Sequence, residues 1–451
     1  MDKLGLAAQF RLVAKFSRGR LATEGAIGRE ASLRQIRNIV RLAYDKTEFY
    51  RDKFDAAGFK PSDLHTWRDF AAIPHTTKIE LLSAGPAAHI GSRIAKAFLS
   101  RTSGSSGIFL NLYAGSDFWI KDGIIGVNAY RRYVNLKAGD RILYGNTSQY
   151  PFTSVGGLLY RVAYFDNLRP VEELIEELIS RRPEVLMAYP SIAADIMQKC
   201  PPSLPALKAV ITHSEQSSQE FRSEIGKFFQ CPVYDEYATE ELGRVAVQCG
   251  FGTYHLIERQ SYCEIVAPDS GFVEPESSTG ELVGTCLINT TMPIIRYRQG
   301  DLASITRSDC PCGERGRILG SLLGRRNASF SLPDGSQIAS GRLLDWTYHL
   351  ILTSRLDILQ FELVQIKHDL VRFFIVPGAA YDYILDRVTI KGSFRKLLTD
   401  RVDLQVVEVP SLARTGAGKR VLIRSEIDSP TKPVNLNGSI GFAIPSGNKA
   451  E

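Results

Sequence analysis

Helix-like and strand-like segments alternate with short links between residues 171 and 234, and this alternation limits the possible folds more than any other feature of the chain. Residues 171–180 place their apolar side chains on one helical stripe, and helices are also expected at 192–199 and 217–230. Short apolar runs at 184–188, 207–212 and 231–234 read as strands between these helices. The pattern is typical of a mostly parallel sheet that is covered by helices on both faces.

The regions on either side of residues 171–234 have different patterns of predicted helices and strands. The first 95 residues read as helices and connections, with a core helix over 31–57. Residues 253–306 suggest a β subdomain with strands at 264–266, 280–283 and 294–297. Residues 328–425 suggest a small α+β unit: helices near 340–356 and 379–401, and strands near 360–366, 370–376 and 403–408. We therefore expect an α/β protein with a large N-terminal domain (1–325, its β subdomain at about 253–320), a C-terminal domain (328–428) and a tail (429–451).

Composition excludes several classes of protein. The formal net charge of +6 is small for 451 residues, and no basic run with interleaved aromatic residues points to nucleic acid. No stretch of 18 apolar residues could form a transmembrane helix, and the basic, amphipathic N-terminus is not read as a signal peptide. Seven cysteines, an odd number in a large chain, argue against a disulfide scaffold and for a reducing, cytoplasmic compartment.

Two motifs have the chemistry of a nucleotide site. Residues 102–107, Thr-Ser-Gly-Ser-Ser-Gly, combine glycine with hydroxyl side chains, so successive N–H groups can form an anion nest over phosphates. A flexible linker is the alternative. Residues 292–301 end in Gly300 and Asp301, and this carboxylate could accept hydrogen bonds from the ribose hydroxyls. The alternative is a surface ion pair with Arg296 or Arg298.

Two further motifs carry charge. Residues 234–243 place acidic side chains directly after a predicted strand, where a carboxylate could hold Mg²⁺, although a solvated acidic turn would look the same. Residues 414–420 place Lys419 on a glycine-rich turn. Its ammonium could neutralise charge while a carboxylate attacks a phosphate, or the turn could be an exposed basic hairpin.

In chain order, the four motifs are preceded by Ile73-Pro74-His75-Thr76-Thr77-Lys78, and Gly324-Arg325 lies between residues 292–301 and 414–420. This ordered set resembles the phenylacetate–coenzyme A ligase branch of the adenylate-forming superfamily, including its capsule-biosynthesis-like members. The resemblance covers most of the chain. It implies that ATP and Mg²⁺ bind to the large domain, and that a mobile C-terminal domain delivers Lys419 for adenylation.

The resemblance also implies roles for individual residues. The ATP phosphates would contact Thr102, Ser103, Gly104, Ser105, Ser106 and Gly107. Glu241 is similar to the Mg²⁺-binding glutamate because Gly243 follows two positions later, and Glu240 then replaces the usual serine or threonine beside Thr239. The adenine would lie near Tyr237 and the pair Ser214-Glu215, and the ribose near Asp301 and Arg325. Asn327 would be the hinge. Separately from these roles, Tyr150, Phe152 and His213 are candidates for the acid pocket, and ordinary packing is the alternative.

The chain departs from the family pattern at three places. Ile108-Phe109 follows the phosphate loop where the family has Lys-Pro, so one expected cation is missing. Arg326-Asn327-Ala328 replaces a segment that usually carries two aspartates, and Ala238 replaces a glycine. Asparagine tolerates unusual backbone angles, so a hinge at Asn327 is still expected.

Four residues predict a structural zinc site. Cys310 and Cys312 form a compact thiolate pair on a turn, and Cys249 and His255 supply the spacing for a closed Cys₃His set. Zinc-containing members of the family show a similar pattern. Ordinary free cysteines are the alternative.

The expected reaction is ATP-dependent activation of an aryl or arylacetic acid as an acyl-AMP, followed by transfer to a thiol of coenzyme A or of a phosphopantetheinyl carrier protein. Transfer to an amine or another non-thiol acceptor is one alternative, and a degenerate nucleotide-binding scaffold is another. A homodimer is compatible with the resemblance.

Overall fold

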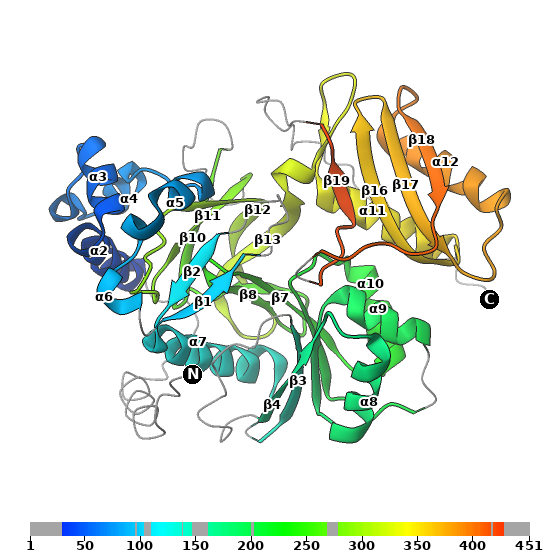
Figure 1. The fold of residues 1–451 in the computed structure, drawn as a ribbon, viewed down its shortest axis with the longest axis horizontal. Helices are drawn as coiled ribbons and strands as arrows, with labels where there is room; N and C mark the ends of the chain where they lie inside the picture. Colours follow the sequence, from blue (N-terminus) through cyan, green and yellow to red (C-terminus); the bar gives the residue numbers. More distant parts are fainter. Residues whose placement is uncertain are drawn as a thin grey trace.

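The computed structural model describes residues 29–94, 97–102, 110–137, 139–146, 161–199, 203–267, 278–415 and 418–427 (Figure 1). Its helices are α2 (Arg29–Lys46), α3 (Glu48–Ala56), α4 (Trp67–Ala72), α5 (Lys78–Ala84), α6 (Gly91–Ile94), α7 (Ser116–Ala129), α8 (Val171–Arg181), α9 (Pro190–Lys199), α10 (Gln219–Phe229), α11 (Ser340–Thr353) and α12 (Leu385–Leu398). Shorter helical turns lie at Pro61–Asp63, Gly85–Ala88, Tyr130–Val134 and Arg326–Ala328. Within this part of the chain, no helix is long and apolar enough to cross a membrane.

One 11-stranded sheet forms the centre of the molecule, in the order β10-β11-β12-β13-β9-β8-β7-β6-β5-β3-β4. Its strands are β3 (Arg141–Asn146), β4 (Arg161–Asp166), β5 (Val185–Ala188), β6 (Ala209–His213), β7 (Val233–Thr239), β8 (Gly243–Gln248), β9 (Tyr254–Leu256), β10 (Ser261–Val266), β11 (Thr279–Cys286), β12 (Tyr297–Asp309) and β13 (Arg315–Arg325). The strands from β4 to β7 pair in parallel, and those from β7 to β10 pair antiparallel. The strands predicted for the β subdomain therefore belong to the same continuous sheet as the parallel strands.

The parallel half of this sheet is buried on both faces, as the alternation predicts. Successive strand residues point to opposite faces, so Leu186 and Val210 pack against α8, α9 and α10, whereas Met187 and Ile211 belong to the core on the side of α7. The mixed α/β fold class is therefore confirmed.

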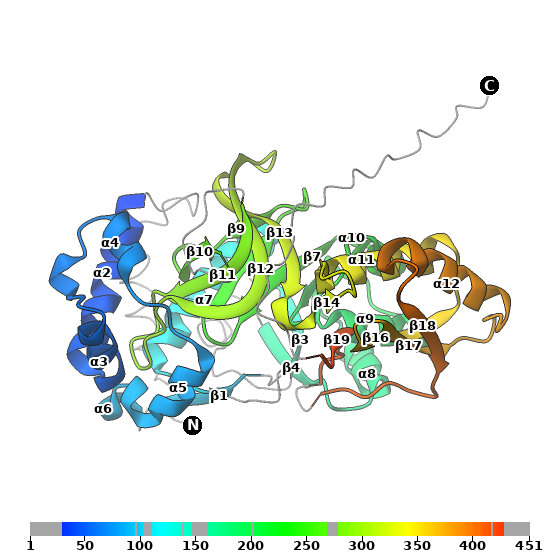
Figure 2. The ribbon, with the colours of Figure 1, turned by 90° about the horizontal axis from the view of Figure 1, so that it is seen from above.

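Residues from Phe330 to Ile423 share a separate hydrophobic core. It is built on a four-stranded sheet in the order β18-β17-β16-β19, made by β16 (Ile358–Lys367), β17 (Leu370–Pro377), β18 (Asp403–Glu408) and β19 (Ile423–Ser425). Helices α11 and α12 contribute Leu344 and Phe394 to this core. Two small sheets, β1 (Phe98–Arg101) with β2 (Asn111–Ala114) and β14 (Phe330–Ser331) with β15 (Gln337–Ile338), complete the described strands. We call residues 329–427 the C-terminal unit; it and helices α2–α4 lie at opposite ends of the molecule (Figure 2).

Two local predictions are wrong. The helix expected over 31–57 is broken at Thr47, whose extended backbone caps the start of α3 and whose hydroxyl donates to the Ala43 carbonyl. The strand expected at 294–297 begins only at Tyr297. Arg296 has a left-handed backbone (φ 44°), and its buried guanidinium is fixed by Glu264 and by carbonyls of the N-terminal helices. These contacts divert the chain before it can pair as a strand.

Candidate functional site

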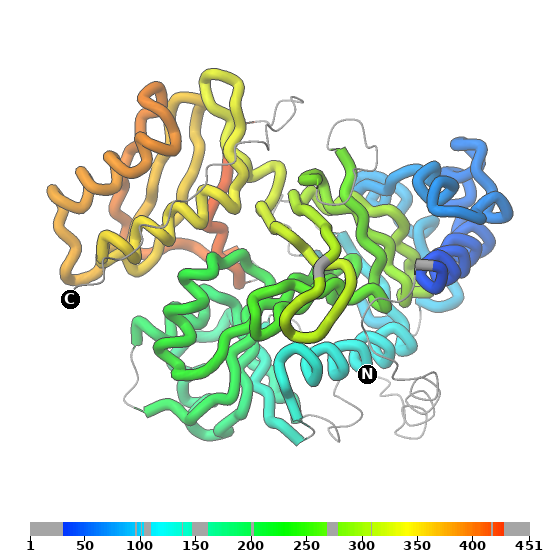
Figure 3. The backbone as a smooth tube through the Cα atoms, turned by 180° about the vertical axis from the view of Figure 1, so that it is seen from behind, coloured from blue at the N-terminus to red at the C-terminus, as the bar shows by residue number. Residues whose placement is uncertain are grey.

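A cavity of about 1190 Å³ lies between the central sheet and the C-terminal unit. It is lined by residues from β6, β7, β12 and β13, and by the last described segment of the chain, which returns from the C-terminal unit toward α9 and α10 (Figures 1 and 3). Among the sequence-predicted residues, the cavity is lined by Thr102, His213, Ser214, Glu215, Tyr237, Thr239, Glu240, Glu241, Asp301, Arg325, Asn327 and Lys419. The others, Ser103, Gly104, Ser105, Ser106, Gly107, Tyr150 and Phe152, lie outside the described residues.

Asp301 is held in place by two partners. Tyr237 donates its hydroxyl to Asp301 Oδ2 at 2.6 Å, and Arg325 Nε lies 3.4 Å from Asp301 Oδ1. Residues 301 and 325 are direct neighbours on β12 and β13, so the register of this hairpin brings the two motifs together. Burial and the Asp301 carboxylate raise the pKa of Tyr237, which keeps the phenol a hydrogen-bond donor.

Glu240 and Glu241 lie at the tip of the β7–β8 hairpin. The Leu242 N–H donates to the Thr239 hydroxyl at 3.2 Å, and Gly243 turns the chain with φ of 72°. A Cβ at position 243 would lie 2.1 Å from the Gln260 amide, so this turn requires glycine. Glu241 accepts a hydrogen bond from the Tyr297 hydroxyl at 2.9 Å and lines the cavity, where oxygen ligands could meet a divalent cation.

Glu215 is more constrained than the sequence predicts. Its carboxylate accepts from the Ser191 N–H and hydroxyl at the start of α9, and from the Arg420 N–H of the returning segment. Burial raises its pKa, and these donors oppose that effect. The carboxylate therefore fastens the returning segment to the sheet, and Ser214, with φ of 68°, contributes the adjacent cavity wall.

Lys419 comes from the returning segment but lies inside the cavity. Its ammonium sits 5.9 Å from the centre of the Tyr189 ring. Burial lowers its pKa, while Glu240, Glu215 and Glu241 raise it. A compact cation is thus placed inside the cavity, within electrostatic reach of these carboxylates and of the Arg325 guanidinium.

Asn327 sits in the short turn Arg326–Ala328 between the large sheet and the C-terminal unit. It is exposed and lines the cavity. Its backbone is not left-handed, so the argument from unusual backbone angles does not apply to this conformation.

Sequence reasoning assigned no role to Lys78, which also lines the cavity. It is the first residue of α5, directly after Thr77, which caps this helix in a reciprocal box with Glu80. Burial lowers the pKa of Lys78, Glu241 raises it, and no carboxylate in the described chain forms a direct ion pair with it. The sequence could have indicated Lys78 through its place in the Thr76-Thr77-Lys78 string.

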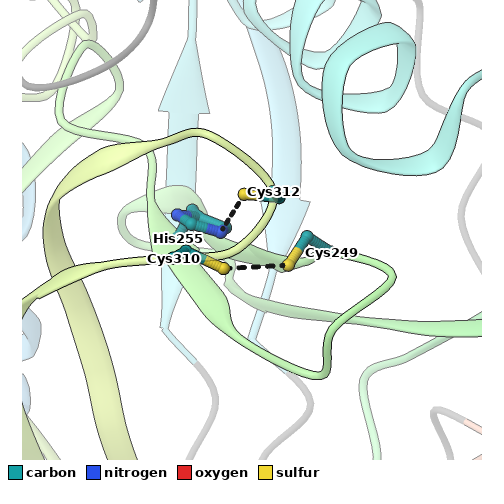
Figure 4. A group of neighbouring side chains, drawn as sticks. All are labelled: Cys249, His255, Cys310 and Cys312. Carbon is teal, nitrogen blue, oxygen red and sulfur yellow. Dashed lines mark hydrogen bonds between the residues drawn. The ribbon is translucent and has the colours of Figure 1, made fainter.

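A second cluster is formed by Cys249 of the β8–β9 turn, His255 of β9, and Cys310 and Cys312 of the β12–β13 turn (Figure 4). Their ligand atoms all lie within 4.8 Å of one another. Cys249 Sγ lies 3.7 Å from Cys310 Sγ, and Cys312 Sγ lies 3.3 Å from His255 Nε2. The His255 ring stacks on Tyr133, with centroids 4.6 Å apart and planes within 1°.

These thiol distances fit a metal. Bonds of about 2.3 Å to a tetrahedral zinc place two sulfurs about 3.8 Å apart, close to the separation of Cys249 and Cys310. A disulfide would need about 2.05 Å, and these cysteines are free.

Comparisons with known proteins place the chain among ligases. No family model matches it. It is 26% identical over 320 residues to the phenylacetate-coenzyme A ligase of Thermus thermophilus, covering 64% of this chain and 68% of that protein. It is 28% identical over 317 residues to the same-named ligase of Aromatoleum evansii, covering 66% and 70%.

Solved structures show the same fold. The 2-hydroxyisobutyryl-CoA ligase in the postadenylation state, in complex with 2-HIB-AMP, has a TM-score of 0.75 at 21% identity and covers 90% of this chain and 91% of that one. The same ligase in complex with 2-HIB-AMP and CoA in the thioesterification state has a TM-score of 0.61 at 20% identity, covering 89% and 92%. The backbone of the present chain therefore superposes better on the first of these two structures than on the second.

Proposed function

Because its sequence relatives are phenylacetate–coenzyme A ligases and its fold is that of adenylate-forming acyl-CoA ligases, we propose that this chain activates a carboxylic acid with ATP as an acyl-AMP and transfers the acyl group to the thiol of coenzyme A. The observation that carries the proposal is the convergence of Lys419, Glu241 and Asp301 on one cavity. These residues are far apart in sequence, and a plain surface turn would not bring them together.

In the first step, a carboxylate oxygen of the acid attacks the α-phosphorus of ATP, the bond to the bridging oxygen breaks, and pyrophosphate leaves. Lys419 neutralises the charge that gathers between the two anions. Asp301, held by Tyr237 and Arg325, binds the ribose hydroxyls and fixes the nucleotide. The substrate is its own nucleophile, so the protein contributes position and charge.

Cations on the protein compensate the triphosphate. Lys78 supplies the positive charge that the phosphate loop lacks at Ile108-Phe109, because its ammonium lies on the Glu241 side of the cavity without a direct acidic partner in the described chain. Glu241, with Glu240 beside it, would hold Mg²⁺, which when bound neutralises phosphate charge.

In the second step, the thiol sulfur attacks the acyl carbon and AMP leaves. Withdrawal of Lys419, by rotation of the C-terminal unit about the turn at Asn327, would open the cavity to this thiol. The same thiol on a phosphopantetheinyl carrier protein is a second acceptor of identical chemistry.

The four-residue Cys/His cluster would hold a structural zinc ion. Four protein ligands leave no open position, so bound zinc would tie the β8–β9 turn to the β12–β13 turn and take no part in the reaction. Four free thiol or imidazole ligands also fit the expected reducing cytoplasmic compartment. A homodimer remains a further expectation.

The proposal is tested by incubating the purified chain with ATP, Mg²⁺ and a panel of aryl and arylalkanoic acids, and detecting acyl-AMP by mass spectrometry. Acid-dependent acyl-AMP, converted to a thioester when coenzyme A is added, is the expected result. ATP turnover that is independent of every acid, or no nucleotide binding at all, would contradict it.

A further inference from the structure

Part of the cavity extends as a layer between helix α7 and the parallel half of the sheet. Phe118, Asp122 and Gly126 recur every four residues along α7 and line it, so one face of the helix forms its wall. The opposite wall includes Tyr144 of β3 and Tyr164 of β4, which are neighbours in the strand register.

An aromatic row leads into the layer from the position of Lys419. Tyr189, next to the ammonium, is buried behind the cavity wall, and its ring centroid is 5.2 Å from that of His213, which lines the cavity. His213 is 5.0 Å from Tyr144, and Tyr144 is 5.4 Å from Tyr164. An acid with its carboxylate near Lys419 would lay its body along this row, and aromatic walls at these spacings favour a ring.

A buried charged cluster lies against the far part of the layer. Arg244 Nε donates to Glu236 at 2.7 Å, and Arg244 Nη1 lies 3.2 Å from Asp122 Oδ1. The guanidinium also sits 5.2 Å from the centre of the Tyr130 ring. A Cβ at Gly126 would lie 2.6 Å from Arg244 Nη1, so α7 has room for this guanidinium only because residue 126 is glycine.

The cluster leaves one acceptor facing the cavity. Both side-chain hydrogen bonds to the Asp122 carboxylate, from Arg244 at 3.2 Å and from Gln260 at 3.1 Å, end on Oδ1. Asp122 lines the cavity with 15% of its side chain exposed, so Oδ2 is the oxygen open to a ligand. Two carboxylates share one guanidinium here, so the cluster has hydrogen-bond acceptor capacity to spare.

We infer that the substrate is an aromatic carboxylic acid whose ring carries a hydrogen-bond donor, a hydroxyl or an amino group, and that Asp122 Oδ2 accepts this donor. The inference rests on the proposed function, because it orients the acid by its carboxylate near Lys419. Burial raises the pKa of Asp122 and Arg244 lowers it, and a donor from the substrate would favour the ionised carboxylate in the same way as Arg244. A plain hydrocarbon ring would leave this oxygen desolvated and unpaired.

The test compares kcat/KM for acyl-AMP formation among ring-substituted phenylacetic acids, with substituents at the meta and para positions. Amino and hydroxyl groups donate, a methyl group has similar size without a donor, and a methoxy group only accepts. At one of the two ring positions, the chain should prefer aminophenylacetic or hydroxyphenylacetic acid over the methyl-substituted acid by roughly tenfold or more in kcat/KM. The amino and hydroxyl arms distinguish the two kinds of donor.

Asp122→Asn gives the sharper result. The amide oxygen would stay with Arg244 and Gln260, and the amide nitrogen would then face the cavity as a donor. The preference for aminophenylacetic acid over methoxyphenylacetic acid should therefore be lost or reversed in this variant. Asp117→Asn, on the same helix but ion-paired with Lys121 at the protein surface, is the matched control and should keep the original preference.

Binding of ATP, measured in the absence of acid, shows whether Asp122→Asn is folded. Equal activity with the methyl-, methoxy-, hydroxyl- and amino-substituted phenylacetic acids would overturn the inference and leave the proposed function standing. An unchanged preference in Asp122→Asn would overturn it also. Absence of acyl-AMP with every acid would overturn the proposed function, and this inference with it.

Discussion

Asp195 of α9 links the returning segment to the large domain, so its replacement should change the balance between the two half-reactions. Its carboxylate accepts from Arg414 at 2.5 Å and from Arg420 at 2.8 Å. Both arginines lie within six residues of Lys419. Breaking these contacts should release Lys419 from the cavity more often, without touching any residue that lines it.

The structure gives an approximate size for this effect. Hydrogen bonds between charged groups contribute about 1.5–3 kcal/mol each when buried, and exposed ion pairs contribute about 0–1 kcal/mol. Asp195 is 15% exposed and its partners 9% and 21%, so the pair of contacts lies between these limits. Because asparagine can still accept one bond, we expect Asp195→Asn to cost about 2 kcal/mol, or roughly 30-fold in the population of the present arrangement.

The assay measures each half-reaction separately. Acid-dependent exchange of labelled pyrophosphate into ATP reports the first, and thioester formation from synthetic acyl-AMP and coenzyme A reports the second. Asp195→Asn should slow exchange by up to about 30-fold and leave the second half-reaction equal or faster. Glu172→Gln, which removes an exposed ion pair between α8 and Lys199 at the C-terminal end of α9, is the control. An equal loss in both half-reactions, or no loss of exchange, would show that Asp195 does not hold Lys419 in the cavity.

Three further outcomes follow from the structure. Lys78→Gln should lower kcat/KM for ATP by roughly tenfold or more while Lys78→Arg retains most of it, and equal behaviour of the two variants would argue against a charge contact with phosphate. The purified chain should contain about one zinc per chain, and Cys312→Ser should lose it and melt about 5 °C lower, unlike Cys231→Ser; metal analysis without zinc in the parent chain would contradict this. Burial lowers the pKa of His213 to about 3, so the folded chain resists protonation there, and stability should fall as pH drops below about 6.5. His213→Gln should remove about 2 kcal/mol of that loss at pH 5, measured by denaturant unfolding at several pH values; an acid limb of the same slope would contradict it.

Local pattern predicted much of the fold, because several elements are specified by their own residues. The helical stripe of 171–180 becomes α8, and the strand expected at 403–408 has the observed bounds of β18. The Cys-x-Cys pair at 310 and 312 is a local pattern, and residue type alone pointed to Cys249 and His255, which the structure places beside it.

Features that depend on tertiary contacts could not be predicted in this way. Asp122 and Arg244 meet only because α7 packs on β8, and nothing in either local sequence indicates this pairing. Likewise, Arg296 breaks the expected strand because Glu264 and the N-terminal helices bind its guanidinium. The position of Lys78 likewise depends on how α5 packs, because this packing brings its ammonium into the same cavity as Glu241.

In the proposed function, Lys419 serves the adenylation step from within the cavity and has no role once acyl-AMP has formed. Pyrophosphate exchange and thioester formation from synthetic acyl-AMP, measured for Lys419→Ala beside the parent chain, test it most directly. Exchange should fall by a hundredfold or more, on the order of a lost charge contact in a transition state, while thioester formation should be retained. Full exchange activity in Lys419→Ala, or equal loss of both activities, would contradict it.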